Sequence, residues 1–396
     1  MAGPIGFSRR TAWEAEETAL ARAYRARRQA GLPIADLTAS NPTRCGFDYP
    51  AALLDALADR RALDYDPQPK GLLVAREAVC RYYAEHGAAV DPDQIVLTTS
   101  TSEAYSFLFR LLCDPGSEIL IPEPSYPLFE FLAQLDDVRL KPAALIYESG
   151  WQLDIEGLRQ AIGPQTRAVV IVHPNNPTGH YTKPEEAEAL GRLCREHGLA
   201  LIVDEVFLDY AMGGKPRSFA RGLEGVQVFV VSGLSKICGL PQMKAAWIVV
   251  SGPERKRALE RLEIVADTFL SMNAPVQWAM RSWIESRAAI QEQISRRTEA
   301  NLATLDRGLA ALPAVQRLKA EGGWYAVVRI PALQPDEQTA LELLGQGVWV
   351  HPGYFFGMPE SGWLVVSLLG GELEFSNGLG IFVNYLGTNQ ECNKER

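Results

Sequence analysis

Three polar side chains follow three apolar runs of the sequence, and their order predicts a shared site. Asn176 lies after the first run, Asp204 directly after the second and Lys236 a few residues after the third. The runs indicate buried strands, and they cover residues 168–172, 200–203 and 226–231. Separations of 28 and 32 residues between the polar groups suit a helix followed by a returning parallel strand. We therefore expect the three groups at the carboxyl edge of one sheet, where open α/β folds bind ligands.

An amide, a carboxylate and a lysine at one edge of a sheet are the groups that a pyridoxal phosphate site requires. Lys236 at the mouth of a buried strand is partly desolvated, which makes its neutral, nucleophilic form accessible for a Schiff base. Asp204 can hold the pyridine nitrogen protonated, and the Asn176 amide can donate to the ring hydroxyl. Lys236 alone would be interpreted as a solvated loop residue, but the two upstream groups favour the cofactor site.

Three short motifs carry these residues: Asn-Asn-Pro-Thr-Gly at 175–179, Asp-Glu-Val-Phe at 204–207 and Ser-Lys at 235–236. In this order and spacing they resemble the class I/II aminotransferases, which are pyridoxal-phosphate enzymes of fold type I. The resemblance spans roughly residues 36–368. It implies that Lys236 and Asp204 are the catalytic residues and that Asn176 donates to O3′ of the cofactor.

The resemblance also implies the fold and the domain organisation. We expect an α/β protein with a three-layer, aspartate-aminotransferase-like large domain around a mostly parallel sheet, and a smaller α+β domain. The expected boundaries are 1–50 for an N-terminal helix and arm that belong to the small domain, 51–275 for the large cofactor-binding domain and 276–396 for the C-terminal small domain. A chain of 396 residues is long enough for two such domains to share a cleft.

The remaining cofactor contacts that the resemblance implies begin after the predicted strand 95–98. Hydroxyl groups at the start of a helix cap it and present N–H groups to a phosphate, which predicts a phosphate cup there. Tyr126 matches the position that stacks on the pyridine ring, with a core aromatic as the alternative. Tyr65 matches a tyrosine that reaches the phosphate of the other subunit, so a homodimer is expected. The expected cofactor-binding set is Tyr65, Ser100, Thr101, Ser102, Tyr126, Asn176, Asp204, Phe207, Ser235, Lys236 and Lys244.

Three positions depart from the family pattern. Lys244 stands where the family usually has an arginine, and a lysine neutralises a phosphate as a point charge without bidentate geometry. Gly233 stands where serine is favoured, so Ser232 or Ser235 is the expected substitute. Phe207 stands at a common tyrosine position and cannot donate to O3′, which we expect to leave that oxygen more basic.

The substrate carboxylate lacks its usual partner in this sequence. Relatives that act on α-amino acids place an arginine on the strand that here covers 363–367, and the matching position is Val365. A buried carboxylate without a cation costs on the order of several kcal/mol. Either Arg44 or Arg329 takes over, or the amino donor has no α-carboxylate. We favour Arg44, which follows a loop that borders the pocket in similar enzymes, and name Asn41 and Arg44 as candidate substrate residues.

Composition excludes several other classes of protein. The net charge of −9 and the pI of about 5.3 argue against nucleic acid as a partner. Six scattered cysteines without a Cys-x-x-Cys pair argue against a metal site or a disulfide framework. The start does not resemble a signal peptide, and no apolar stretch reaches 18 residues. We expect a cytoplasmic protein that is not bound to a membrane and holds no metal. The resemblance implies that its small-molecule partners are an amino donor and a keto acid.

The sequence also predicts the helices around the site. Thr11 and Glu14 form a capping-box pattern that opens a helix running to Gly31. Further helices are expected over 72–86, from the predicted phosphate cup to residue 112, over 253–272, from 274 to about 312 and over 373–386. The polar residues from Gly387 onward are expected to be disordered.

The favoured function is amino-group transfer, in which Lys236 removes and replaces the α-proton as general base and acid. A carbon–sulfur lyase, or another reaction at Cα or Cβ, is the alternative on the same fold. A non-catalytic ligand-binding protein is the alternative from a different class, and the intact Lys236, Asp204 and Asn176 argue against it. Turnover of a half-reaction would exclude it.

Overall fold

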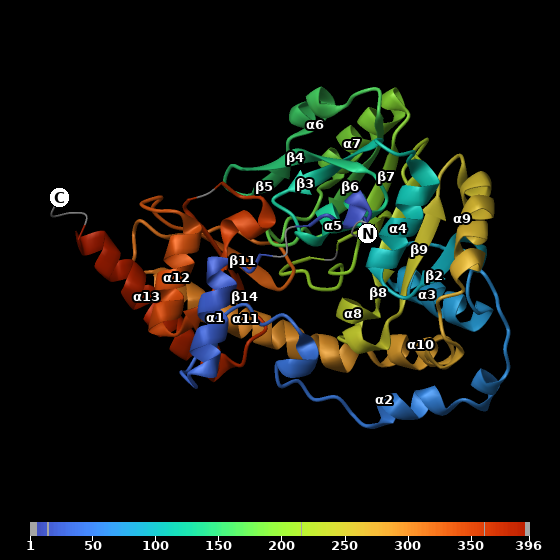
Figure 1. Ribbon diagram of the computed structural model, residues 1–396. Helices are drawn as coiled ribbons and strands as arrows, with labels where there is room; N and C mark the ends of the chain where they lie inside the picture. Colours follow the sequence, from blue (N-terminus) through green and yellow to red (C-terminus); the bar gives the residue numbers. More distant parts are fainter. Residues whose placement is uncertain (1–5, 14–15, 215, 360, 393–396) are drawn as a thin grey trace, which may run out of the picture.

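An eight-stranded sheet forms the centre of the structure, a computed structural model that describes residues 6–13, 16–214, 216–359 and 361–392 (Figure 1). Its strand order is β2-β9-β8-β7-β6-β3-β4-β5. The strands are β2 (Ile95–Thr98), β3 (Glu118–Glu123), β4 (Arg139–Tyr147), β5 (Trp151–Leu153), β6 (Thr166–Val172), β7 (Ala200–Asp204), β8 (Val228–Gly233) and β9 (Ala246–Ser251). Pairing is parallel from β8 through β7, β6 and β3 to β4, and antiparallel where β9 meets β2 and β8 and where β5 meets β4. The expected mostly parallel sheet is confirmed.

Helices cover both faces of this sheet and produce three layers. One face packs against α3 (Leu73–Glu85), α6 (Ile155–Ala161), α7 (Pro184–His197) and α10 (Ala274–Ser286). The other packs against α4 (Thr101–Leu112), α5 (Leu128–Leu135) and α9 (Arg255–Phe269). In β6, for example, Ile171 joins the first core and Val170 the second, because successive side chains point to opposite faces. The strand sequences are continuously apolar because both faces are buried.

The three strands that precede the predicted polar groups are neighbours in the sheet. β6 pairs in parallel with β7, with Val172 opposite Asp204. β7 pairs in parallel with β8, with Asp204 opposite Val231. Their carboxyl ends therefore lie level at one edge of the sheet, which confirms the parallel strands that the residue spacing predicted. The helix expected between Asp204 and Lys236 is wrong, because the described residues between β7 and β8 form loops and a short 3-10 helix, η6 (Phe219–Arg221).

A smaller antiparallel sheet has a core of its own. Its order is β10 (Gln316–Arg317), β11 (Tyr325–Arg329), β14 (Trp363–Ser367) and β13 (His351–Pro352). Apolar residues of α11 (Ala288–Leu309), α12 (Asp336–Gln346) and α13 (Glu372–Cys392) pack there with Leu20 of α1 (Ala19–Gln29). β1 (Ala35–Asp36) pairs in parallel with β12 (Val348–Trp349). The helix α1 from the N-terminal part therefore joins the C-terminal part of the chain here, and the blue α1 lies beside the orange α12 in Figure 1.

The first helix starts later than the sequence predicted. Thr11 ends a short 3-10 helix, η1 (Arg9–Thr11), whose N-cap is Ser8, so Thr11 does not open the main helix. α1 begins at Ala19, and the Thr18 hydroxyl accepts the Ala21 N–H at 3.1 Å as its cap. Glu14, the other half of the expected capping box, lies outside the described residues.

Two predictions for the C-terminal half also need correction. Two helices, α10 and α11, replace the single helix expected from 274 to about 312. They are separated at Arg287, whose Nη1 donates to the Ile284 carbonyl at 2.8 Å. The prediction of disorder from Gly387 onward is wrong for the residues up to Cys392, because α13 continues to Cys392. Phe375, Leu379, Phe382 and Leu386 bury one face of α13 and stabilise it.

Three observations concern the described residues alone. Among them, no helix is both long and apolar enough to cross a membrane. No group of three or more His, Cys, Asp or Glu side chains in those ranges is placed to hold a metal ion. Five cysteines of the described residues are free thiols: Cys45, Cys80, Cys113, Cys194 and Cys238.

Candidate active site

Lys236 lies just beyond β8, where the chain leaves the sheet in the single-turn helix α8 (Leu234–Ile237). Two aromatic rings flank its amine, and Nζ is 4.9 Å from the ring centroid of Trp324 and 5.5 Å from that of Phe207. Burial lowers the pKa of Lys236 to about 8, against the opposing effect of the Asp204 charge. Near this pH a large fraction of the amine is therefore neutral and nucleophilic.

Asp204 is the last residue of β7, and its side chain is buried. Oδ1 accepts the Val206 N–H at 3.0 Å, and Oδ2 accepts the Tyr105 hydroxyl at 3.0 Å. Burial raises the pKa of Asp204 to about 6, while these two hydrogen bonds and the charge of Lys236 limit the rise. At neutral pH the group is thus mostly a carboxylate, and each of its oxygens is held by a donor.

Asn176 lies in the turn that follows β6. The side chain of Asn175 holds this turn, because its amide donates to the Pro124 carbonyl at 3.0 Å and to the Thr178 hydroxyl at 2.9 Å. Asn176 itself is buried, and its Oδ1 has no hydrogen-bond partner among the described residues. An unpaired buried polar atom costs roughly 1–3 kcal/mol. Depending on its rotation, the Asn176 side-chain amide can present either its N–H or its C=O to the cavity, so a ligand can supply the missing hydrogen bond.

The predicted phosphate cup is the start of α4. Ser100 is the N-cap, and its Oγ accepts the Glu103 N–H at 3.1 Å. The Glu103 carboxylate accepts the Thr99 N–H at 2.7 Å and so holds the preceding loop. A helix N-terminus carries a partial positive charge and presents N–H groups to an anion. Lys244, in the left-handed region with φ of 51°, adds a full positive charge to the same cavity.

Packing between β8 and β9 explains the glycine at 233. A Cβ on Gly233 would lie 2.8 Å from the Ala245 carbonyl oxygen and 2.8 Å from the Ala246 Cβ, so a serine does not fit there. Ser232, one expected substitute, is buried and donates to the Glu205 carbonyl at 3.3 Å. Ser235 lines the cavity and is the substitute that the structure places beside the site.

These groups surround one cavity of about 280 Å³. Apolar residues of α5 and Tyr325 of the small sheet complete its wall. Of the eleven residues predicted to bind the cofactor, it brings together Ser100, Thr101, Ser102, Tyr126, Asn176, Asp204, Phe207, Ser235, Lys236 and Lys244. The set fits pyridoxal phosphate, because it offers donors and a cation for a phosphate, an amine for an aldehyde, a carboxylate for a pyridine nitrogen and an unpaired amide for a ring hydroxyl. Tyr126 is 48% exposed, so it is not the core aromatic considered as its alternative.

Three predicted residues lie outside this cavity. Tyr65 is 84% exposed and lines a separate cavity of about 560 Å³. Asn41 and Arg44 belong to the short 3-10 helix η2 (Pro42–Arg44), which Asn41 caps, and both are exposed. Arg329 is exposed at the end of β11, and Val365 is fully buried in the core.

Several residues beside the cavity were not selected from the sequence. Tyr105 is one of them, although a hydroxyl on the apolar face of a helix, five residues after Ser100, is a usable signal. Ser40 and Tyr325 also line the cavity, and Trp324 packs against Phe207 with ring centroids 5.2 Å apart. No local pattern relates residues 324 and 325 to Lys236, because the packing of the small sheet against the large one brings them there.

Comparison with known proteins agrees with this geometry. The sequence matches the family described as aminotransferase class I and II over residues 44–372. Glutamate-pyruvate aminotransferase AlaA of Escherichia coli K12 is 28% identical over 344 residues, covering 83% of this chain and 84% of that protein. Aspartate/prephenate aminotransferase of Thermus thermophilus is 30% identical over 347 residues, covering 85% and 87%. A solved double mutant of Thermus thermophilus aspartate aminotransferase superposes with a TM-score of 0.85 at 27% identity, covering 96% of this chain and all of that one (100%).

The chain therefore belongs to the class I and II aminotransferases. It is a pyridoxal phosphate-dependent enzyme that moves an amino group between an amino donor and a keto acid. Its α/β architecture is that of the family. The carbon–sulfur lyase and the non-catalytic binding protein are not favoured, because the relatives named above are aminotransferases.

Proposed function

We propose that Lys236 is the residue to which pyridoxal phosphate attaches, that Asp204 is the partner of its pyridine nitrogen and that Asn176 binds its ring hydroxyl. The observation that carries this proposal is the meeting of the three groups in one cavity, at the ends of three neighbouring strands. The pKa values of the amine and the carboxylate, about 8 and about 6, lie on either side of neutrality. The amine can then exchange a proton while the carboxylate stays negative.

Each of these side chains has a defined task in the reaction. When bound, pyridoxal phosphate supplies an electron sink that stabilises negative charge at Cα of the amino donor. Lys236 takes the proton from Cα as general base and gives it back as general acid. Asp204 keeps a proton on the pyridine nitrogen, because a carboxylate stabilises positive charge beside it. The N-terminus of α4 and Lys244 bind the phosphate.

Reduction with borohydride followed by peptide mapping tests the attachment residue. The label should lie on Lys236, and a label on another lysine would reject the assignment. A panel of amino donors and keto acids, followed through the absorbance of the cofactor, then identifies the reaction. An aminotransferase converts the cofactor with a donor alone and restores it with a keto acid. Release of pyruvate and sulfide from cysteine without a keto acid would instead indicate a lyase.

We infer that the substrates are small α-amino acids and their keto acids. The names of the relatives refer to glutamate, pyruvate, aspartate and prephenate, which supports a panel built on these compounds. Arg44 is our candidate for the substrate carboxylate, because it is exposed and lies four residues beyond Ser40, which lines the cavity. Its planar guanidinium can pair with both oxygens of a carboxylate.

We also propose a homodimer in which Tyr65 of one subunit reaches the phosphate site of the other. Support comes from the segment before α3, where Leu54, Leu63 and Tyr65 are 60%, 82% and 84% exposed. Large apolar side chains gathered on one surface segment are typical of a protein interface. A cytoplasmic location is part of the same proposal and is supported by the free cysteines of the described chain. Cell fractionation tests the location.

A further inference from the structure

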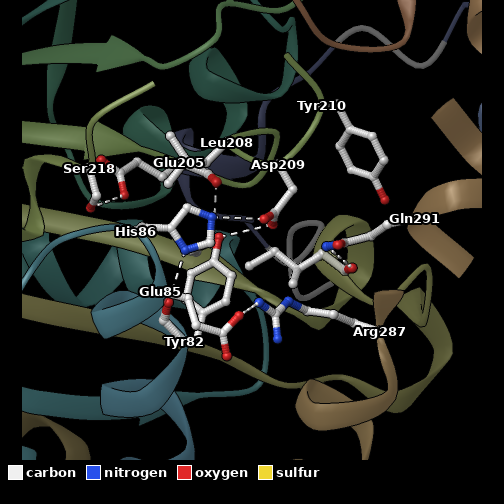
Figure 2. A network of polar contacts seen from close by, with 12 residues as sticks. Tyr82, Glu85, His86, Glu205, Leu208, Asp209, Tyr210, Ser218, Arg287 and Gln291 are labelled. Atoms are coloured by element: carbon white, nitrogen blue, oxygen red, sulfur yellow. Dashed lines mark hydrogen bonds and ion pairs between the residues drawn. The ribbon is translucent and has the colours of Figure 1, made fainter. Parts of the chain in front are cut away.

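Figure 2 shows a group of polar side chains that the proposed mechanism does not use, and one of them, Tyr210, contacts Lys236. Tyr82 lies in α3, His86 is the residue directly after it, and Asp209 and Tyr210 come from the loop that follows β7. We call these four residues the α3–loop network. They connect α3, which covers one face of the large sheet, to the carbonyl of Lys236 in α8.

Asp209 anchors the loop to α3 through two hydrogen bonds. Its Oδ2 accepts the Tyr82 hydroxyl at 3.0 Å, and its Oδ1 lies 2.9 Å from His86 Nε2. The other nitrogen of His86, Nδ1, lies 2.9 Å from the Tyr82 carbonyl. Both ring nitrogens face acceptors, and this arrangement favours the doubly protonated, positively charged imidazole. Burial alone would lower the pKa of His86, but the hydrogen bond and the charge of Asp209 raise it above its ordinary value.

The ion pair between His86 and Asp209 is mostly shielded from water. The two side chains are 15% and 9% exposed. Arg287, at the start of α11, places its guanidinium 5.1 Å from the ring centroid of Tyr82 and forms an ion pair with Glu85. Loss of one member of a shielded pair leaves the other charge without compensation, so the pair resists separation. The loop is therefore held firmly at Asp209.

Tyr210, the residue after Asp209, connects the anchored loop to Lys236. Its hydroxyl donates to the main-chain carbonyl of Lys236 at 2.7 Å. Its ring packs edge-on against Trp324, with centroids 5.0 Å apart, and the same Trp324 ring flanks the lysine amine. The loop also carries Phe207 on the other flank of that amine. One short loop thus contacts Lys236 at its main chain and at the end of its side chain.

The turn that carries Lys236 is held by main-chain donors and by side chains from elsewhere in the chain. α8 has four residues, and the carbonyl of Lys236 accepts the Gly239 N–H at 3.1 Å. Gln291 donates to the Ile237 carbonyl at 2.9 Å, and Tyr49 donates to the Gly239 carbonyl at 2.7 Å. Tyr210 is the side-chain donor to the Lys236 carbonyl, and it is buried.

We propose that Tyr210 is a positioning residue for Lys236, and that the ion pair of Asp209 and His86 holds Tyr210 in place for this task. The hydrogen bond to the lysine carbonyl keeps the amine between the two aromatic rings and away from water. The proposal rests on Lys236 being the attachment residue. It concerns the lysine's surroundings, so it can be tested separately from the attachment itself.

Two tyrosine variants that lose the same kind of hydrogen bond test the proposal. Tyr210→Phe removes the donor to Lys236, whereas Tyr181→Phe removes a hydroxyl that donates to the Leu208 carbonyl of the same loop at 2.9 Å. The first measurement is the pH dependence of Lys236 labelling by an amine reagent, read by mass spectrometry on the full-length chain freed of cofactor. The second is the pH titration of the cofactor absorbance in the loaded enzyme.

We expect both midpoints to move to higher pH in Tyr210→Phe, because a loosened lysine gains water and its charged form is favoured. The labelling midpoint should rise by about half a pH unit, a roughly threefold change in the ratio of charged to neutral amine. Tyr181→Phe should leave both midpoints in place, and thermal unfolding should show a comparable loss of stability in the two variants. Unchanged midpoints in Tyr210→Phe, or equal shifts in both variants, would overturn the proposal.

A third variant tests the role of the ion pair. His86→Gln keeps a donor near Asp209 but removes the charge, and it should raise the midpoints in the wild-type background. Combined with Tyr210→Phe it should add nothing, because the pair acts through Tyr210. Additive shifts would reject the proposal that the ion pair acts through Tyr210. Tyr82→Phe serves as the second variant if His86→Gln does not fold. Labelling without cofactor stays informative even if borohydride maps the cofactor to another lysine, so the two failures are distinguishable.

Discussion

Asp204 and Lys236 show how burial adjusts single residues for this chemistry. The same loss of water lowers the pKa of the amine to about 8 and raises that of the carboxylate to about 6. Without its two hydrogen bonds, the carboxylate would be protonated over more of the physiological range. Tyr105 supplies one of them, so its hydroxyl keeps Asp204 ionised.

Tyr105→Phe should therefore weaken cofactor binding at mildly acidic pH. In the proposed site Asp204 binds the protonated pyridine as a carboxylate, so we expect binding to be favourable above pH 6 and to weaken as pH falls through the pKa of about 6. Removing the Tyr105 hydrogen bond raises this pKa, so the loss should begin at higher pH. Cofactor titrations of the apoenzyme from about pH 5 to 8 measure this. The cofactor phosphate titrates identically in both proteins, so overlapping curves would contradict the role of Tyr105.

Arg44→Ala tests the proposed partner of the substrate carboxylate. A charge-assisted pair supplies about 1.4 kcal/mol or more, so KM for an α-amino acid donor should rise at least about tenfold. Arg329→Ala is the matched control, since Arg329 is exposed and stacks on Trp363 at 5.3 Å. Unchanged kinetics in Arg44→Ala with a raised KM in Arg329→Ala would transfer the role to Arg329. No effect in either would favour a donor without an α-carboxylate.

At the scale of elements, the start of α4 caps a helix, and in our proposal it also binds the phosphate. Ser100→Ala removes the cap and should cost about 1 kcal/mol of stability. It should also weaken cofactor binding by about tenfold or more, the value of one hydrogen bond to a charged group. Thr18→Ala removes the cap of α1 and should match the loss of stability without changing cofactor affinity. Equal affinities of Ser100→Ala and the wild type would exclude Ser100 from the phosphate site.

The elements that the sequence predicts best are the buried strands. β6, β7 and β8 are continuous apolar runs because helices cover both faces, and this pattern also locates Asn176, Asp204 and Lys236 at their ends. Helix ends are harder, because a cap at Thr11 and a cap at Thr18 are locally similar and packing decides between them. The α3–loop network was not predictable, since contacts between distant segments place His86 beside Asp209.

At the scale of the whole molecule, the small sheet completes the site from the far end of the sequence. Trp324 and Tyr325 reach the cavity from β11 and its preceding turn. The domain boundary expected at 275 remains a prediction, and the core suggests where to look for it. Met280 and Trp283 of α10 pack with the large sheet, whereas Leu305 and Leu309 of α11 pack with the small one. We infer that the boundary between the large and the small domain falls within α11, which packs against both.

The proposed dimer explains why Tyr65 lies outside the cavity of its own chain. A tyrosine that is 84% exposed beside exposed leucines gains buried apolar area when a second subunit covers it. Gel filtration should then show about twice the 43.6 kDa of one chain. Mixing Tyr65→Phe with Lys236→Ala subunits should restore about one normal site in each mixed dimer, because one partner supplies Lys236 and the other supplies Tyr65.

A second mixture distinguishes the shared site from a site within one chain. Wild-type subunits mixed with a chain that carries both Tyr65→Phe and Lys236→Ala form a dimer whose remaining Lys236 faces the partner's Phe. If Tyr65 acts across the interface, this dimer has no normal site, whereas the first mixture has one. If Tyr65 acts within its own chain, the second mixture has one normal site and the first has none, because the wild-type subunit then keeps a complete site. Comparing the two mixtures at equal content of mixed dimer therefore decides which subunit supplies the tyrosine.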